Sequence, residues 1–152
     1  MNVISKEVRN SKVNIKKVTE LAIEAGRILL KNGAEIFRVE ETITRICHSF
    51  GVANVDVFIL SHALFVTTEC EGRTYTRIKA VPLSGAHLGI VVEVNKLSRA
   101  IVEGKVDMDE AYQKLKEINK IRPMKDIHHI LAAGTTSICF GALLGAGLAE
   151  CI

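Results

Sequence analysis

The sequence of 152 residues has little of what nucleic-acid-binding proteins use, since it contains no tryptophan and only 5% of its residues are aromatic. Aromatic side chains supply stacking platforms for single strands, and a one-sided stripe of lysine and arginine supplies the contacts to phosphates. The formal net charge is only +3, and acidic residues are mixed with basic ones along the first 129 residues. We therefore expect no nucleic-acid partner.

The cysteines and histidines lack the spacings of metal sites. The four cysteines, Cys47, Cys70, Cys139 and Cys151, form no CxxC pair, and no two histidines stand four residues apart. The sequence also has no glycine-rich phosphate loop after a strand and no GxSxG motif. We expect no metal, no cofactor and no enzymatic activity. Because the first ten residues lack the apolar core of a secretory signal, we expect reduced cysteines that act as small apolar residues.

Ionisable side chains are absent from residues 130–149, which read ILAAGTTSICFGALLGAGLA. A helix of about 20 residues reaches roughly 30 Å, the hydrocarbon thickness of a bilayer, so this length predicts a transmembrane helix. Lys120, Arg122 and Lys125 precede the run, and the positive-inside tendency then places residues before 130 in the cytoplasm. The alternative is a glycine-rich helix packed in the core of a soluble domain.

Small residues recur at every fourth position of this run and would form one shallow ridge along a helix. In a membrane, close backbone approach over small residues is a main source of helix association, so we expect the ridge to pack against further helices. Thr135 and Ser137 also offer hydroxyls to a polar substrate, although such groups usually bond back to their own helix. The ridge consists of Ala133, Ser137, Gly141, Gly145 and Ala149.

The chain before this run reads as a short arm and one domain. Residues 1–13 are polar and unpatterned, and we expect a flexible arm before a domain of residues 14–125. Apolar residues at steps of three and four predict helices over residues 14–33 and 36–50, and Asn14 is a typical cap for the first of them.

The period then changes from the helical one to two. β-Branched residues alternate with others and predict strands over residues 55–60, 64–68 and 74–81, joined by short turns. Helical spacing returns over residues 87–102 and 107–118, where Asp107 and Glu110 resemble a capping box. We predict an α+β fold of order α-α-β-β-β-α-α, with a small antiparallel sheet covered by helices and followed by the carboxy-terminal transmembrane helix.

Three stretches of the sequence resemble the amino-terminal part of the threonine/serine exporter family of bacterial inner-membrane proteins. They are NGAEIFRVEETI beginning at Asn32, LFVT beginning at Leu64 and VNKLSR beginning at Val94. The resemblance covers residues 18–149. It implies a cytoplasmic α+β domain that leads into a bundle of several transmembrane helices. The implied activity is export of small amino acids such as threonine and serine, or of dicarboxylates in a two-subunit variant, driven by the proton gradient.

The chain departs from that family pattern because it ends after what would be the first membrane helix. We expect a fragment of a longer protein whose further membrane helices meet the small-residue ridge. The alternative is a short subunit that needs a membrane partner, and assembly as a homo-oligomer is also compatible with the sequence. A different class of function also stays open, namely a soluble α+β ligand-binding or enzymatic domain with residues 130–149 in its core.

The densest set of opposite charges lies at the start of the second predicted helix and includes Glu35, Arg38 and Glu41. Charges three or four residues apart usually form a solvated, salt-bridged helix face. The functional interpretation is that Glu35 and Arg38 contact a ligand or the cytoplasmic mouth of the transport path, with Glu41 as a further candidate. The family resemblance falls on the same positions.

Overall fold

The computed structural model describes residues 14–82, 85–121 and 126–143. The chain divides into two compact units, residues 1–121 and residues 122–152. We call the first the α+β unit, and each unit is described by itself. The predicted arm of residues 1–13 lies outside the described residues.

The first helix of the α+β unit, α2, spans Ile15–Lys31 and is its central element. Asn14 caps it as predicted, because the Asn14 side chain accepts a hydrogen bond from the backbone N–H of Lys17 at 3.2 Å. Side chains around most of its circumference are buried, unlike those of a surface helix with a single apolar stripe. A helix with this pattern must be covered from more than one side.

The second helix, α3, spans Ile36–Ser49 and buries Val39, Ile43 and Ile46. Its link from α2 is short because Gly33 adopts a φ of +82°, a left-handed conformation that glycine takes at little cost. The two helices therefore fold back on each other as the sequence predicts.

Three strands form an antiparallel meander in the order β1-β2-β3: β1 (Asn54–Leu60), β2 (Ala63–Cys70) and β3 (Arg73–Ala80). Two-residue turns join them, and the second turn has positive φ at both Glu71 and Gly72. In the register, Val57 pairs with Val66 and Phe58 pairs with Phe65. The predicted strands and their order are confirmed.

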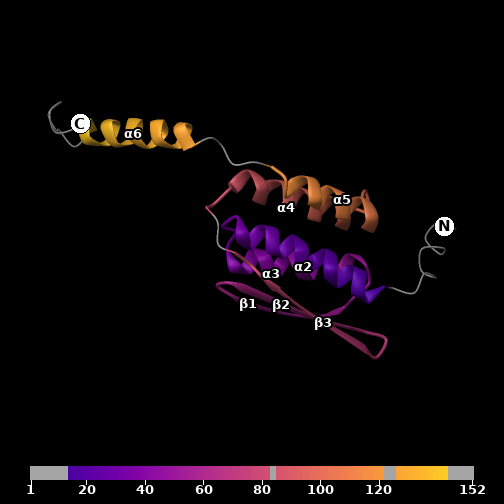
Figure 1. Ribbon diagram of the computed structural model, residues 1–152. Helices are drawn as coiled ribbons and strands as arrows, with labels where there is room; N and C mark the ends of the chain where they lie inside the picture. The colour runs from indigo at the N-terminus through magenta and orange to yellow at the C-terminus, as the bar shows by residue number, and fades with distance from the viewer. Residues whose placement is uncertain (1–13, 83–84, 122–125, 144–152) are drawn as a thin grey trace. The chain divides into compact units, whose positions relative to one another are not determined.

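The helix α4 spans Leu88–Val102 and α5 spans Met108–Ile118. The predicted cap of α5 is present, since Asp107 Oδ1 accepts a hydrogen bond from Glu110 N–H at 2.8 Å. Figure 1 shows α2 and α3 as a middle layer, with the sheet on one side and α4 and α5 on the other. This arrangement explains why α2 is buried around most of its circumference.

The two faces of the sheet differ. Leu64, Val66 and Thr68 of β2 point into the core and are buried. On the opposite face, Phe58 and Ile78 are exposed on either side of Phe65, and the Phe58 and Phe65 rings meet edge to face with centroids 6.1 Å apart. The helices therefore cover one face of the sheet, as an antiparallel sheet allows.

The second unit contains the helix α6, which spans Asp126–Leu143. No helix among the described residues is both long and apolar enough to cross a membrane. In the described part of α6 the first turn is polar, and the apolar residues from Ile130 to Leu143 number about 14, or roughly 21 Å of helix. The expected transmembrane helix over residues 130–149 is thus not found, and its last six residues, 144–149, lie outside the described part of the chain.

Candidate functional site

Glu35 and Arg38 lie at the amino-terminal end of α3, where both side chains face solvent. Glu35 is the residue before the first helical turn, and its Oε2 lies 4.0 Å from Arg38 Nε. The Arg38 guanidinium also lies over the ring of Phe37, 5.7 Å from its centroid. The side chains of Arg38 and Glu35 are 55% and 69% exposed, so the contact between them is a surface ion pair.

A groove of about 790 Å³ runs along the outer face of α3 and the end of α4. Its α3 residues recur at steps of three and four, so they line one side of the helix. Glu41 lines this groove, whereas Glu35 and Arg38 do not. We call it the α3 groove, and its lining residues are Phe37, Glu40, Glu41, Thr44, Arg45, His48, Ser49 and Val102.

Arg45 is the one arginine among the residues that line the α3 groove, and it is held from two sides. Its Nη1 donates a hydrogen bond to Ser98 Oγ at 3.3 Å, and its Nη2 donates one to the Glu41 carboxylate. Ser98 belongs to α4 and is fully buried, whereas Glu41 stands one turn before Arg45 on α3. The Arg45 side chain is 29% exposed and that of Glu41 is 59% exposed. One partner is therefore part of the core, and the other lies at the surface.

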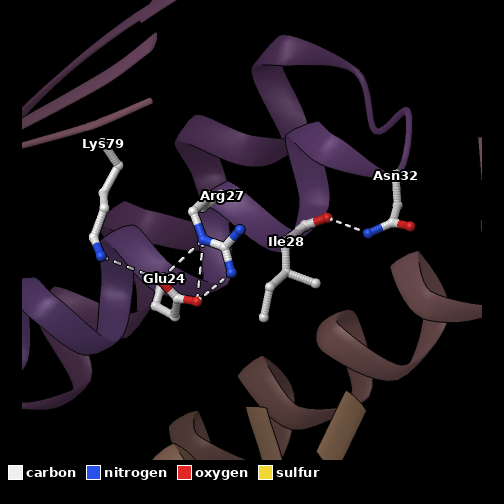
Figure 2. A network of polar contacts seen from close by, with 5 residues as sticks. All are labelled: Glu24, Arg27, Ile28, Asn32 and Lys79. Atoms are coloured by element: carbon white, nitrogen blue, oxygen red, sulfur yellow. Dashed lines mark hydrogen bonds and ion pairs between the residues drawn. The ribbon is translucent and has the colours of Figure 1, made fainter. Parts of the chain in front are cut away.

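A second cluster of charges joins α2 to β3 (Figure 2). Glu24 lies between Arg27 and Lys79, with Arg27 Nη2 at 2.5 Å from Oε1 and Lys79 Nζ at 3.7 Å from Oε2. Burial raises the pKa of Glu24, but the hydrogen bonds and positive charges of Arg27 and Lys79 outweigh it and leave that pKa below its ordinary value of 4.5. This cluster binds two elements of the unit together and does not line the α3 groove.

Asn32, the first residue of the NGAEIFRVEETI stretch, has a structural role. It is buried, its Nδ2 donates a hydrogen bond to the Ile28 carbonyl at 2.7 Å (Figure 2), and its own carbonyl accepts one from His87 N–H at 3.1 Å. A Cβ at Gly33 would lie 2.9 Å from Ala86 Cβ. The stretch thus fixes the α2–α3 link against the residues that lead into α4.

On α6, the described part of the predicted ridge is Ala133, Ser137 and Gly141, while Gly145 and Ala149 lie outside the described residues. Thr135 Oγ1 donates a hydrogen bond to the Leu131 carbonyl at 2.8 Å, which is the local pattern expected of a hydroxyl within a helix. The α6 helix and the α3 groove belong to different units, so the candidate residues fall into separate groups.

Cys47 and the acidic side chains form neither a reactive nor a metal-binding arrangement among the described residues. In the described ranges, no group of three or more histidine, cysteine and acidic residues is placed to hold a metal ion. Burial raises the pKa of the Cys47 thiol from 9.0 to about 12, so this cysteine behaves as an apolar core residue.

The family match defines the class of protein. The chain belongs to the family described as "Putative threonine/serine exporter", which matches residues 20–152. This match contains the three stretches on which the resemblance was based, and it confirms that resemblance.

The particular relatives are transporter subunits. The chain is 28% identical over 130 residues to the "Probable succinate transporter subunit YjjP" of Klebsiella aerogenes and 26% identical over 130 residues to the protein of the same name from Escherichia coli strain K12. Each alignment covers 86% of this chain and 50% of the relative. The chain thus spans about half the length of the curated relatives it matches. No solved structure matches it significantly.

Sequence reasoning found one residue of the α3 groove, Glu41, and missed the contact that anchors Arg45. The i, i+4 spacing of Glu41 and Arg45 was visible as a charge pair. Ser98 is 53 positions from Arg45, and nothing in a single sequence indicates that they touch. Ser98 lies within the VNKLSR stretch that begins at Val94, and the family resemblance of that stretch is the sequence signal that points to this residue.

Proposed function

We propose that this chain is a component of an inner-membrane exporter of small amino acids, or of dicarboxylates, driven by the proton gradient. The observation that carries the proposal is the family match over residues 20–152, which includes both units of the chain. The two curated relatives bear the name of a succinate transporter subunit, which supports the dicarboxylate version.

In this proposal the α+β unit lies in the cytoplasm, and residues 130–149 begin the part of the transporter that enters the membrane. Large apolar side chains on α6, including Ile130, Leu131 and Phe140, are exposed, which supports their burial against lipid or other helices. Membrane fractionation tests the placement. The chain should stay in the pellet after alkaline or high-salt washing and leave it only with detergent.

The further membrane helices come, in this proposal, from the rest of the same polypeptide or from a partner subunit. The share of each relative that is covered, 50%, and the word "subunit" in their names support this need for more protein. Co-purification in detergent with a tagged partner, or with the remaining half, tests it. Recovery of the chain as a homo-oligomer that exports by itself would contradict it.

Efflux from preloaded cells tests the activity. Cells that lack their own exporters are loaded with radiolabelled threonine, serine or succinate, and efflux is compared with and without the complete transporter. We expect faster efflux of one substrate class, abolished by an uncoupler. Unchanged efflux of all three would refute the exporter proposal.

A second function, a soluble ligand-binding domain, is favoured by one observation, the α3 groove, whose volume of about 790 Å³ falls within the range of small-molecule sites, roughly 300–1,000 Å³. This version requires residues 130–149 to pack as a core helix. Full solubility of the chain without detergent would favour this second function.

A further inference from the structure

We propose that the α3 groove binds the carboxylate of a small zwitterion, with Arg45 as the binding residue and Glu41 as an internal carboxylate that the ligand displaces. The inference rests on the proposed export function for the kind of molecule, and on the contacts of Arg45 for the site.

The first step is the fixed position of the Arg45 guanidinium. Its hydrogen bond to Ser98 Oγ, at 3.3 Å, joins it to a side chain that is fully buried in α4. A planar guanidinium presents several N–H donors in a rigid fork, which matches a carboxylate. Because Nη1 is hydrogen-bonded to this buried side chain, the position of a guanidinium that lines the groove is restricted before any ligand binds.

The second step is that the ion pair between Glu41 and Arg45 is weak. Its carboxylate already occupies one donor of Arg45, which shows that this position accepts a carboxylate. The Glu41 side chain is 59% exposed, and such a surface ion pair contributes little net stability. A ligand carboxylate can therefore replace it while Glu41 turns into solvent.

The third step concerns the class of ligand. Glu40 also lines the groove, so after Glu41 has turned into solvent one carboxylate remains at the site and favours a ligand ammonium group over a second ligand carboxylate. Phe37 and Val102 add apolar surface for a short side chain. The groove residues therefore favour an amino acid over a dicarboxylate.

Binding of radiolabelled ligands to the chain of residues 1–152 in detergent micelles tests the proposal by equilibrium dialysis. We expect threonine to bind, and threoninamide, which lacks the carboxylate, and succinate to bind at least about tenfold more weakly, the scale of one lost charge-assisted hydrogen bond. Equal binding of threonine and threoninamide would overturn the proposal.

Two substitutions have opposite expected effects. Arg45→Gln should weaken threonine binding by about tenfold or more, with Arg45→Lys in between, because a single ammonium lacks the fork. Glu41→Gln should tighten binding severalfold because the internal competitor loses its charge. A Glu41→Gln variant that binds threonine more weakly than the unchanged chain would show that Glu41 does not compete with the ligand.

The matched control is the pair Glu110 and Lys114 on α5, which has the same i, i+4 spacing and a 2.8 Å contact outside the groove. Glu110→Gln and Lys114→Gln should leave threonine binding unchanged, and thermal unfolding checks that every variant is folded. If the complete transporter exports threonine but binding does not depend on Arg45, this inference fails while the proposed function stands. If no substrate is exported, the proposed function fails.

Discussion

Single charged residues in the α+β unit differ in how far they are removed from water, and this decides what each contributes. Glu24 is partly buried and has two positive partners, Arg27 and Lys79. The Glu35 side chain is mostly exposed, and its partner Arg38 lies 4.0 Å away. Buried groups that keep their charge do so because partners replace the lost hydration. The same reasoning applies to the neutral thiol of Cys47, which is buried without any such partner for a negative charge and has a raised pKa.

Glu24 should make the free energy of unfolding depend on pH in the acidic range. Its folded-state pKa lies below the ordinary value of 4.5, so the contribution is fully present above about pH 4.5 and is lost as the pH falls through the lowered pKa. Glu24→Gln should therefore reduce the free energy of unfolding by about 1 kcal/mol near pH 7 and by less near pH 3.5. Urea unfolding at both pH values measures this. A difference that grows on acidification would contradict it.

Cys47 should be unreactive until the unit unfolds. With a pKa of about 12, its thiolate population at pH 8 is on the order of a thousandfold lower than that of an ordinary thiol, and burial also blocks the reagent. Iodoacetamide labelling of a variant that keeps only Cys47 should be slow in the native state and fast in denaturant. A variant that keeps only Cys70, which is partly exposed at the end of β2, should react faster than the Cys47 variant in the native state.

At the scale of elements, the unit depends on close contact where α2, α3 and β2 meet. A Cβ at Gly26 would lie 2.5 Å from Ile43 Cδ1 and 3.0 Å from Leu64 Cδ2, both of which are fully buried. Elsewhere between α2 and β2, the buried hydroxyls of Thr19 and Thr68 hydrogen-bond to each other at 2.6 Å. The absence of a side chain at one helical position thus allows the sheet and two helices to meet.

Gly26→Ala should destabilise the unit in spite of the higher helix propensity of alanine. Overpacking costs about 1–3 kcal/mol and the propensity gain is about 1 kcal/mol, so a net loss of up to about 2 kcal/mol is expected. Ile43→Val removes the Cδ1 atom in conflict, and the double variant should be more stable than the sum of the two changes by about 0.5 kcal/mol or more. Denaturant unfolding of all four proteins measures this coupling, and strict additivity would contradict the contact.

At the scale of the whole molecule, the chain combines an α+β unit that has its own core with a second unit whose described helix exposes apolar side chains. The exporter family match includes residues of both units. In the proposed exporter, the exposed charges at the start of α3 belong to the surface that meets a ligand or the cytoplasmic mouth of the transport path.

Glu35→Ala and Arg38→Ala should each lower export by the complete transporter and leave its stability nearly unchanged. Both side chains are mostly exposed, so their loss should change the free energy of unfolding by about 0.5 kcal/mol or less. Efflux of the preferred substrate and thermal unfolding are measured on the same preparations. Normal efflux by both variants would remove these residues from the transport path, and export after deletion of residues 1–125 would reduce the unit to an assembly scaffold.

Much of the α+β unit could be predicted because the signals are local. Apolar spacing placed α2, α3, α4 and α5, while the caps at Asn14 and Asp107 marked where two of them begin. Alternation placed the strands, and short turns left an antiparallel meander as the simple arrangement. Of the predicted site residues on α3, Glu41 lines the α3 groove, whereas Glu35 and Arg38 lie outside it, and their roles stay predictions.

The sequence by itself determined the element order of the α+β unit and the family, because helix periodicity, caps and motifs depend on residues that are neighbours in the chain. Only the tertiary structure decided that α2 lies between two layers and that Arg45 is anchored by Ser98. It also decided that the first described turn of α6 begins at Asp126, before the predicted span. Contacts between residues some 50 positions apart follow from packing, and packing depends on the shapes of all the surfaces that meet.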